Sequence, residues 1–388
     1  MERIQANYHF IKELGAGGYA RVHLAEHRRT KLLVAIKVIS ISERRNDSAY
    51  IDRIDQEVNL MKKMNHPFIC ELFEVVVEPG QCYFIVMEYL EGGTLLERLN
   101  TTGSIAESTA KNIFFQLVSA VYYIHRFNIV HRDIKIENIL FDHARNIRLI
   151  DFGLSCLKKE EGSLMHTKCG SMSYAAPEMI KGEEYSSSVD IWSMGIVLYA
   201  MLTGELPFKD ENTQKLMQNI VYNDPIFPQN LSRGAIDLLQ RMLTKDSKSR
   251  ITIPDILKHP WVHSAIFPLI VDFNSIDPEI LKGLEMYGYD SREIESSILN
   301  NLGSDGVIAY KIAHRAKLMD QIKSPLAQNS RKVSSLKTRN VPISPFIKNG
   351  QIMPLMKPPI VMPRSVRRQS FSAASMIKQS GSFPIGSI

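Results

Sequence analysis

Two short segments near the middle of the chain constrain it more than any other feature. They are His131–Asn138 (HRDIKIEN) and Leu149–Gly153 (LIDFG). Phosphoryl transfer needs a carboxylate that orients and deprotonates the attacking hydroxyl, oxygen ligands for Mg²⁺, and a cation on the triphosphate. Asp133, Asn138 and Asp151 are residue types that supply the carboxylate and the oxygen ligands.

Two motifs nearer the N-terminus would supply the remaining parts. The glycine-rich stretch Gly15–Val22 (GAGGYARV) lies between two expected strands, and Lys37 follows the apolar run Val34–Ile36. Glycines let backbone N–H groups approach phosphate oxygens closely, and a lysine can provide the cation. Taken alone, a glycine-rich hairpin is more often a plain tight turn, and a lysine at a strand end is normally solvated.

The pattern of apolar residues changes along the chain. Its first part alternates short β-branched and aromatic runs with turns and contains one helix near Tyr50–Met64, where apolar residues recur at helical spacing. From about Leu95 the pattern is helical. The expected strands are Phe10–Leu14, Ala20–Ala25, Leu33–Ile39, Leu72–Val77 and Tyr83–Met87, and the later helices include Ala106–His125, Ser187–Thr203, Gln214–Tyr222 and Arg233–Leu243. A β-rich part followed by a helical part predicts an α+β fold.

The motifs, with Ala176-Pro177-Glu178 after Asp151, occur in the order and spacing of the protein-kinase signatures. The chain therefore resembles the eukaryotic protein kinase family over residues 8–262. The resemblance implies a bilobal fold with a β-rich N-lobe at about 8–90 and a helical C-lobe at about 91–262. It also implies ATP and Mg²⁺ as cofactors, and protein substrates with serine or threonine acceptors.

The same resemblance assigns roles to individual residues. Lys37 would hold the α- and β-phosphates and pair with Glu57. Asp133 would be the catalytic base, with Lys135 beside it, while Asn138 and Asp151 would hold Mg²⁺. The other residues expected around the nucleotide are Leu14, Gly15, Ala16, Gly17, Gly18, Tyr19, Ala20, Arg21, Val22, Ala35, Glu88, Leu90 and Leu140, with Met87 behind the adenine. His131 is expected to pack rather than to transfer protons, and Arg250 is expected to pair with Glu178.

Sequence details point to a narrower group. Lys135, two residues after the base, and the stretch Gly170–Glu178 are typical of serine/threonine-specific kinases. The stretch Thr167–Ser171 (TKCGS), followed by Tyr174–Glu178 (YAAPE), resembles the activation segment of AMP-activated-protein-kinase-related kinases. These belong to the calcium/calmodulin-dependent kinase group and include the maternal embryonic leucine-zipper kinase.

In that branch a ubiquitin-associated-like module of three helices follows the kinase domain. Residues 277–316 resemble one, with helices expected at Pro278–Met286, Ser291–Leu299 and Asp305–Ala316. An unspecialised helical extension and a ubiquitin-binding domain remain as alternatives.

Thr167 lies between Asp151 and Glu178, and Arg132 precedes the expected base. We expect phosphorylation of Thr167, by an upstream kinase, to order this loop, since a phosphate could form about one to three charge-assisted hydrogen bonds to Arg132 and Arg53. The alternative is an exposed loop threonine without a regulatory role.

The basic charge of the chain is concentrated at its C-terminal end. Residues 321–388 hold eleven Lys or Arg and no Asp or Glu, which leaves 36 basic and 41 acidic residues in 1–320, a net charge of −5. This distribution disfavours a nucleic-acid-binding role. The serine- and proline-rich composition predicts a basic, disordered tail with at most weak contact to anionic membranes.

Together these features predict a monomeric ATP-dependent serine/threonine protein kinase. The alternative is a pseudokinase scaffold acting through the C-terminal module and tail. No stretch is long and apolar enough to cross a membrane, the N-terminus lacks the apolar region of a secretory signal, and four scattered cysteines suit a reducing interior. A cytoplasmic location, with access to the nucleus, is therefore expected.

Overall fold

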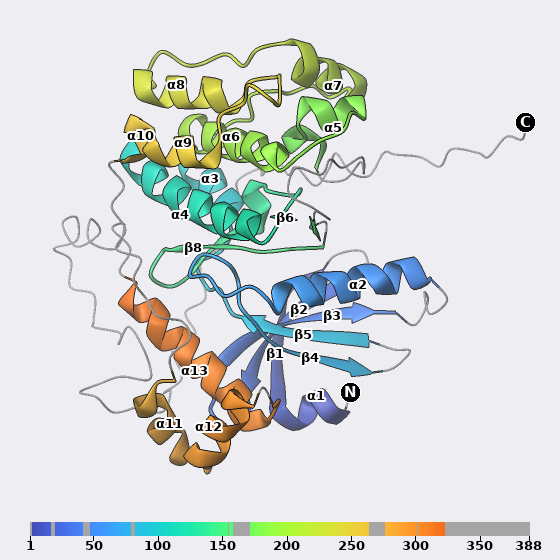
Figure 1. The fold of residues 1–388 in the computed structure, drawn as a ribbon, viewed down its shortest axis with the longest axis vertical. Coiled ribbons are helices and arrows are strands. Elements are labelled where there is room, and N and C mark those ends of the chain that lie inside the picture. The colour runs from blue at the N-terminus through green and yellow to red at the C-terminus, as the bar shows by residue number, and fades with distance from the viewer. Residues whose placement is uncertain are drawn as a thin grey trace, which may run out of the picture.

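The expected bilobal α+β fold is what the chain adopts (Figure 1). The computed structural model describes residues 2–16, 20–41, 47–78, 82–153, 155–157, 171–263, 276–300 and 302–322. A β-sheet forms most of the N-lobe, helices form the C-lobe at the opposite end, and three further helices lie beside the sheet. No helix among the described residues is long and apolar enough to cross a membrane.

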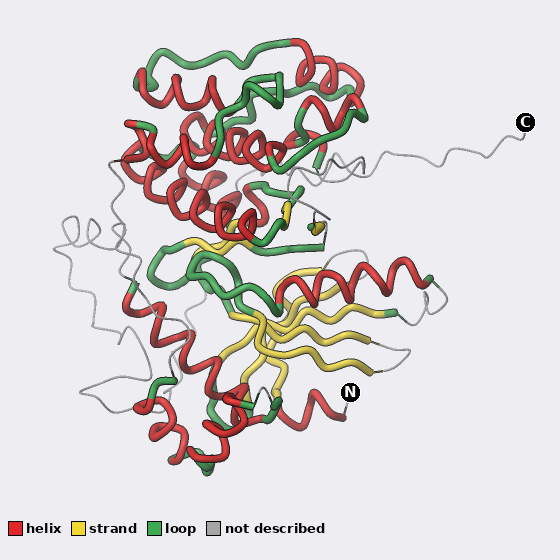
Figure 2. Tube along the Cα trace, viewed as in Figure 1, coloured by secondary structure: helices red, strands yellow, loops and turns green. Residues whose placement is uncertain are grey.

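The N-lobe is a five-stranded antiparallel sheet with the strand order β1-β2-β3-β5-β4 (Figure 2). Its strands are β1 (Tyr8–Ala16), β2 (Ala20–His27), β3 (Leu33–Ser40), β4 (Leu72–Glu78) and β5 (Cys82–Glu88). The helix α2 (Ser48–Met61) follows β3, as the apolar spacing predicts. A short helix, α1 (Glu2–Asn7), precedes β1 and was not expected.

Alternation along β3 gives the sheet two different faces. Side chains in a strand point alternately to opposite sides. Val34 and Ile36 are fully buried in an apolar cluster that also contains Ile312 from the C-terminal helices. Ala35 and Lys37 line a cavity on the other side, between the lobes. One face of the sheet thus packs against the C-terminal helices, and the other faces the cleft.

The C-lobe is built around one helix that is buried on all sides. Every residue of α6 (Ser188–Thr203) from Val189 to Leu202 is buried, as expected for a helix at the centre of a large domain. The surrounding helices are α3 (Leu95–Thr102), α4 (Glu107–Arg126), α5 (Pro177–Lys181), α7 (Thr213–Tyr222), α8 (Arg233–Met242), α9 (Ile253–Lys258) and α10 (Pro260–His263). Two small antiparallel pairings are also present, β6 (Ile129–Val130) with β9 (Cys156–Leu157) and β7 (Ile139–Phe141) with β8 (Ile147–Leu149).

The three helices expected after the kinase-like region are present. They are α11 (Pro278–Glu285), α12 (Ser291–Leu299) and α13 (Asp305–Gln321), and they share a small apolar core. The third helix continues five residues beyond its expected end at Ala316, and Ile322 is buried. Residues 321 and 322, assigned to the tail from the sequence, therefore belong to the folded part. The rest of the expected tail lies outside the described residues.

Arg250 and Glu178 form the expected ion pair, which is fully enclosed in the C-lobe. Two guanidinium nitrogens of Arg250 donate to the two carboxylate oxygens of Glu178 at 2.7 and 2.9 Å. We predict that Glu178→Gln lowers the free energy of unfolding by about 3–5 kcal/mol, because it leaves a buried guanidinium without its counter-charge. Urea unfolding followed by circular dichroism measures this.

The matched control is Glu205→Gln, which breaks the exposed pair between Lys209 and Glu205. We expect this variant to unfold at the same urea concentration as the wild type, since exposed pairs contribute little. Equal unfolding midpoints for Glu178→Gln and the wild type would contradict the structural role of the buried pair.

Candidate active site

The loop that carries Asp133 is fastened to the buried helix α6 through Asp190. The carboxylate of Asp190 accepts hydrogen bonds from the backbone N–H of His131 and of Arg132, both at 2.9 Å, and contacts Nε2 of His125 at 2.8 Å. Burial raises the pKa of Asp190, but its hydrogen bonds and the neighbouring histidines more than offset this, so its pKa lies below the usual value. A buried carboxylate thus fixes the backbone immediately before Asp133.

Asp133 lies at the centre of a small polar cluster. Its side chain is 7% exposed, and Oδ2 accepts from Nζ of Lys135 at 2.6 Å and from Nδ2 of Asn138 at 2.9 Å. Oδ1 accepts from the hydroxyl of Ser171 at 3.4 Å, and Lys135 also donates to that hydroxyl at 3.2 Å. The arrangement holds a carboxylate and an ammonium group at one serine hydroxyl. It is therefore able to bind a second hydroxyl or a phosphate oxygen.

Lys37 on β3 and Glu57 on α2 form an ion pair within the N-lobe. Nζ of Lys37 lies 2.7 Å from Oε1 of Glu57 and 3.9 Å from Oδ1 of Asp151. Burial alone would lower the pKa of Lys37, but the two carboxylates more than offset it, so the pKa is raised and the lysine stays charged. The ion pair therefore holds α2 against the sheet, and the ammonium group of Lys37 faces the carboxylate of Asp151.

A cavity of about 470 Å³ lies between the lobes and contains most of the residues expected around a nucleotide. Its lining includes Leu14, Gly15, Val22, Ala35, Lys37, Glu57, Met87, Glu88, Leu90, Leu140 and Asp151. Ala16, Ala20 and Arg21 are not among the lining residues, and Gly17, Gly18 and Tyr19 lie outside the described residues. Cys70 also lines the cavity, which the sequence did not suggest.

Asn138 and Asp151 are suited to hold Mg²⁺ together with phosphate oxygens. Nδ2 of Asn138 donates to the backbone oxygen of Asp133 at 2.9 Å, which directs its amide oxygen away from that residue. The carboxylate of Asp151 is 43% exposed. Mg²⁺ is usually bound by one or two protein oxygens and substrate phosphates. The described residues contain no group of three or more metal-ligating side chains of the His, Cys, Asp or Glu type.

His131 occupies the packing position expected for it. Burial lowers its pKa, its Nε2 contacts the backbone oxygen of Ile150 at 3.2 Å, and its ring packs on Phe152 with centroids 5.0 Å apart. The backbone N–H of Asp133 donates to its Nδ1 at 3.3 Å. Both ring nitrogens therefore serve to position the loop.

Thr167, the expected regulatory residue, lies outside the described residues. Arg132 has a positive φ of 66° and donates from Nη1 to the hydroxyl of Tyr185 at 3.3 Å. Asp190 was not among the residues expected from the sequence. A single acidic residue inside the apolar stretch Val189–Leu202 was the available signal, since such an acid must be paired if the helix is buried.

The sequence of the chain matches the protein kinase domain over residues 8–262. It is 38% identical over 317 residues to SNF1-related protein kinase catalytic subunit alpha KIN12 of Arabidopsis thaliana, covering 80% of this chain and 64% of that protein. It is 36% identical over 349 residues to maternal embryonic leucine zipper kinase of Xenopus tropicalis, covering 87% of this chain and 53% of that protein. The chain thus spans between half and two thirds of the length of these curated relatives.

We predict that Glu57→Gln lowers kcat/KM for ATP by about 10- to 100-fold, because a hydrogen bond between charged groups contributes roughly 1.5–3 kcal/mol. The substitution leaves Lys37 without its carboxylate partner on α2. Steady-state kinetics with varied ATP measure the effect.

Asp55→Asn is the control on the same helix. It alters the contact between the hydroxyl of Tyr83 and Oδ1 of Asp55 at 3.0 Å, which lies away from Lys37. We expect its kcat/KM to stay within about twofold of the wild type. If both variants lost activity equally, the effect would come from the docking of α2 and not from the charge on Glu57.

Proposed function

The chain belongs to the protein kinase family, and on that premise we propose that it is an active serine/threonine kinase of the AMP-activated-protein-kinase-related branch. It would transfer the γ-phosphate of Mg-ATP to protein hydroxyls. The polar cluster at Asp133 carries this proposal. Lys135 donates to Oδ2 of Asp133, and the hydroxyl of Ser171 donates to Oδ1.

Each residue of the cluster has a distinct task in this proposal. Asp133 orients the acceptor hydroxyl and takes its proton as the new bond to phosphorus forms. Lys135, 2.6 Å from Asp133, stabilises negative charge on the transferred group. Lys37 binds the nucleotide phosphates and is held in place by Glu57. Mg²⁺, held by Asn138 and Asp151, would neutralise charge on the phosphates.

The pocket supports an adenine-binding role for the segment after β5. Leu14, Val22, Ala35 and Leu140 supply apolar lining. Glu88, the last residue of β5, and Leu90, two residues later, also line the cavity. The backbone N–H of Glu88 already donates to the oxygen of Glu71 at 2.9 Å. Glu88 would therefore offer its backbone oxygen to the base, and Leu90 its backbone N–H.

The pseudokinase alternative lacks support. Lys37, Asp133 and Asp151 are the residues whose loss would favour a catalytically inactive scaffold, and all are present. Lys37 is paired with Glu57, and Asp133 is bound by Lys135.

We further propose that the module at 276–322 acts within the chain and not as a ubiquitin receptor. The turn between α11 and α12 faces the β2–β3 turn of the N-lobe. The guanidinium of Arg29 lies 3.6 Å from the ring centroid of Tyr289 and donates to the backbone oxygen of Tyr287 at 2.9 Å. A ubiquitin molecule would have to displace these contacts to reach that turn.

Phosphorylation of Thr167 by an upstream kinase is the proposed activating step. It is supported by the proximity in sequence of Arg132 to Asp133, and by the fastening of Arg132 to Asp190 through its backbone. We also propose that the enzyme is cytoplasmic and monomeric. It would act on protein substrates and have no nucleic-acid partner.

We predict that Asp133→Asn lowers kcat by about 100-fold or more, because the general base is lost while the shape of the site is kept. The measurement uses radiolabelled ATP and a degenerate serine/threonine peptide library. Equal labelling by the variant and the wild type would refute the proposed mechanism. Nucleotide affinity should remain close to that of the wild type, which distinguishes loss of catalysis from loss of folding.

We predict that Thr167→Ala lowers kcat by about tenfold or more in enzyme treated with an activating kinase, because the phosphate can no longer pair with arginine. Thr203→Ala is a suitable control, since the hydrogen bonds of its hydroxyl are to backbone groups of Tyr199 and Glu205 at the end of α6. A Thr167→Ala enzyme with the kcat of the phosphorylated wild type would exclude this form of regulation.

A further inference from the structure

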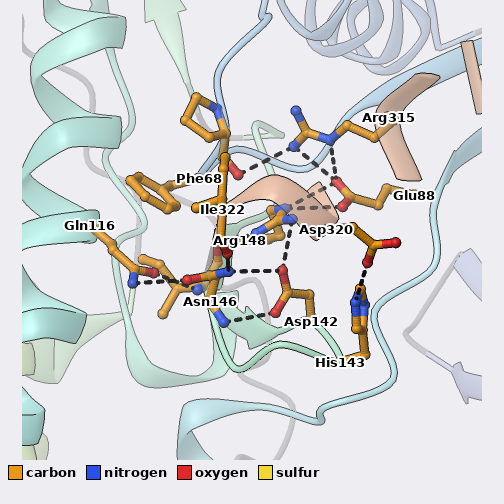
Figure 3. Close-up of polar contacts among 12 residues, drawn as sticks. Phe68, Glu88, Gln116, Asp142, His143, Asn146, Arg148, Arg315, Asp320 and Ile322 are labelled. Atoms are coloured by element: carbon orange, nitrogen blue, oxygen red, sulfur yellow. Dashed lines mark hydrogen bonds and ion pairs between the residues drawn. The ribbon is translucent and has the colours of Figure 1, made fainter. Parts of the chain in front are cut away.

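Arg315, on α13, is one of the most deeply buried charged residues among the described parts of the chain. It is 2% exposed, and its guanidinium group reaches the carboxylate of Glu88 (Figure 3). Its Nε and Nη2 donate to Oε2 of Glu88 at 3.2 and 3.1 Å. Glu88 lines the cavity, so a residue of the C-terminal module contacts the wall of the proposed adenine site.

The same guanidinium binds the chain segment between α2 and β4. It donates to the backbone oxygen of Ile69 at 2.7 Å and to that of His66 at 3.2 Å. This segment is also attached to β8, because the backbone N–H of Cys70 donates to Leu149 at 3.0 Å. Arg315 therefore binds two segments near the cavity. One is the connection between α2 and β4, and the other is the end of β5 at Glu88.

Arg315 supplies one of the two guanidinium groups that face the carboxylates around Glu88. Arg148, fully buried on β8, donates from Nε to Glu88 at 3.0 Å and from Nη2 to Asp142 at 3.0 Å. Glu71 lies 3.3 Å from Nε of Arg315. Without Arg315, three carboxylates would share one arginine. Burial raises the pKa of Glu88, but Arg148 and Arg315 together bring it below its usual value.

The far end of α13 is fixed separately to the C-lobe. Oδ1 of Asp320 lies 2.9 Å from Nε2 of His143, and Nδ2 of Asn146 donates to the backbone oxygen of Ile322 at 2.9 Å. Leu318, Met319 and Ile322 join the large apolar core, which contains most of the C-lobe core and part of the N-lobe, whereas Ile312 joins the cluster on the other face of the N-lobe sheet. The helix α13 therefore contacts both lobes. Arg315 lies between the two ends of this contact and pairs with Glu88, the last residue of β5.

We propose that Arg315 is a positioning residue for nucleotide binding: it fixes Glu88 and the segment before β4, and thereby the wall against which adenine packs. This inference rests on the proposed kinase function. Arg315 does not touch the nucleotide. Its effect is therefore expected in the affinity for ATP and much less in the rate of phosphoryl transfer at saturating ATP.

The test compares Arg315→Met with Arg315→Lys and with Asp320→Asn in the full chain. Nucleotide affinity is measured by calorimetry with ATP and Mg²⁺, and kcat is measured at saturating ATP. We expect Arg315→Met to raise the Kd for ATP about tenfold or more, since it removes hydrogen bonds to a buried carboxylate. Arg315→Lys should have an intermediate effect, because lysine keeps the charge but not the planar fork. Asp320→Asn, on the same helix, should stay within about twofold.

A second substitution separates positioning from folding. Glu71→Gln removes one of the carboxylates that Arg315 neutralises, so Arg315→Met with Glu71→Gln should recover part of the lost ATP affinity. Unchanged ATP affinity in Arg315→Met, or a fall in kcat with unchanged affinity, would overturn the inference. A wild-type chain that binds no nucleotide would refute the proposed function instead.

One measurement needs no substitution. Coupling between two sites is reciprocal, so bound nucleotide must stabilise the contacts of Arg315 if those contacts stabilise the nucleotide. Hydrogen exchange of the backbone amides of α13 should slow by about threefold or more when Mg-ATP is added. Identical exchange in α13 with and without nucleotide would overturn the inference, even if every Arg315 variant failed to fold.

Discussion

The hydrogen bonds from the catalytic loop to Asp190 are the interaction on which the site most depends. Asp190 lies in α6, a helix with no solvent-exposed face between Val189 and Leu202, so its position is set by the whole C-lobe core. Two backbone N–H groups bind its carboxylate, and the next residue in the chain is Asp133. A charged group in this environment is stable only because every nearby donor is directed at it. The packed core thereby fixes the backbone position of the proposed base, Asp133.

A second carboxylate, that of Glu88 at the end of β5, is 11% exposed and belongs to a residue that lines the cavity between the lobes. Its partners come from two distant elements, Arg148 on β8 and Arg315 on α13. Asp190 accepts mainly from backbone N–H groups, whereas Glu88 accepts from two arginines and from one backbone N–H group, that of Glu71 at 3.4 Å. This difference matters because an arginine can be withdrawn if its helix moves, while backbone donors of a packed loop cannot. The N-lobe wall is therefore the side of the cleft that depends on a separate module.

The sequence was sufficient for the fold class and for most of the site. Strand and helix positions followed from apolar spacing, and α12 begins and ends where expected. Lys37 and Asp133 were found because each belongs to a motif with fixed spacing, and Glu57 was assigned through the resemblance to the kinase family. Arg148 could not be found, because alternation in the strand Ile147–Leu149 suggests a solvent-facing residue, and only its distant partners explain its burial. The last turn of α13 was missed because the residues that Leu318, Met319 and Ile322 pack with lie far away in the sequence.

The two faces of the N-lobe sheet explain why α13 belongs with the kinase-like fold. Val34 and Ile36 share an apolar cluster with Ile312, and α13 packs against β4, so removal of the module would expose part of the sheet's apolar face. Ile36 shares its strand with Lys37, which points to the opposite face. A shift of β3 towards solvent would therefore move the lysine that meets Glu57 and the nucleotide cavity. Because side chains alternate along one strand, packing by the module on one face and nucleotide binding on the other depend on the same backbone.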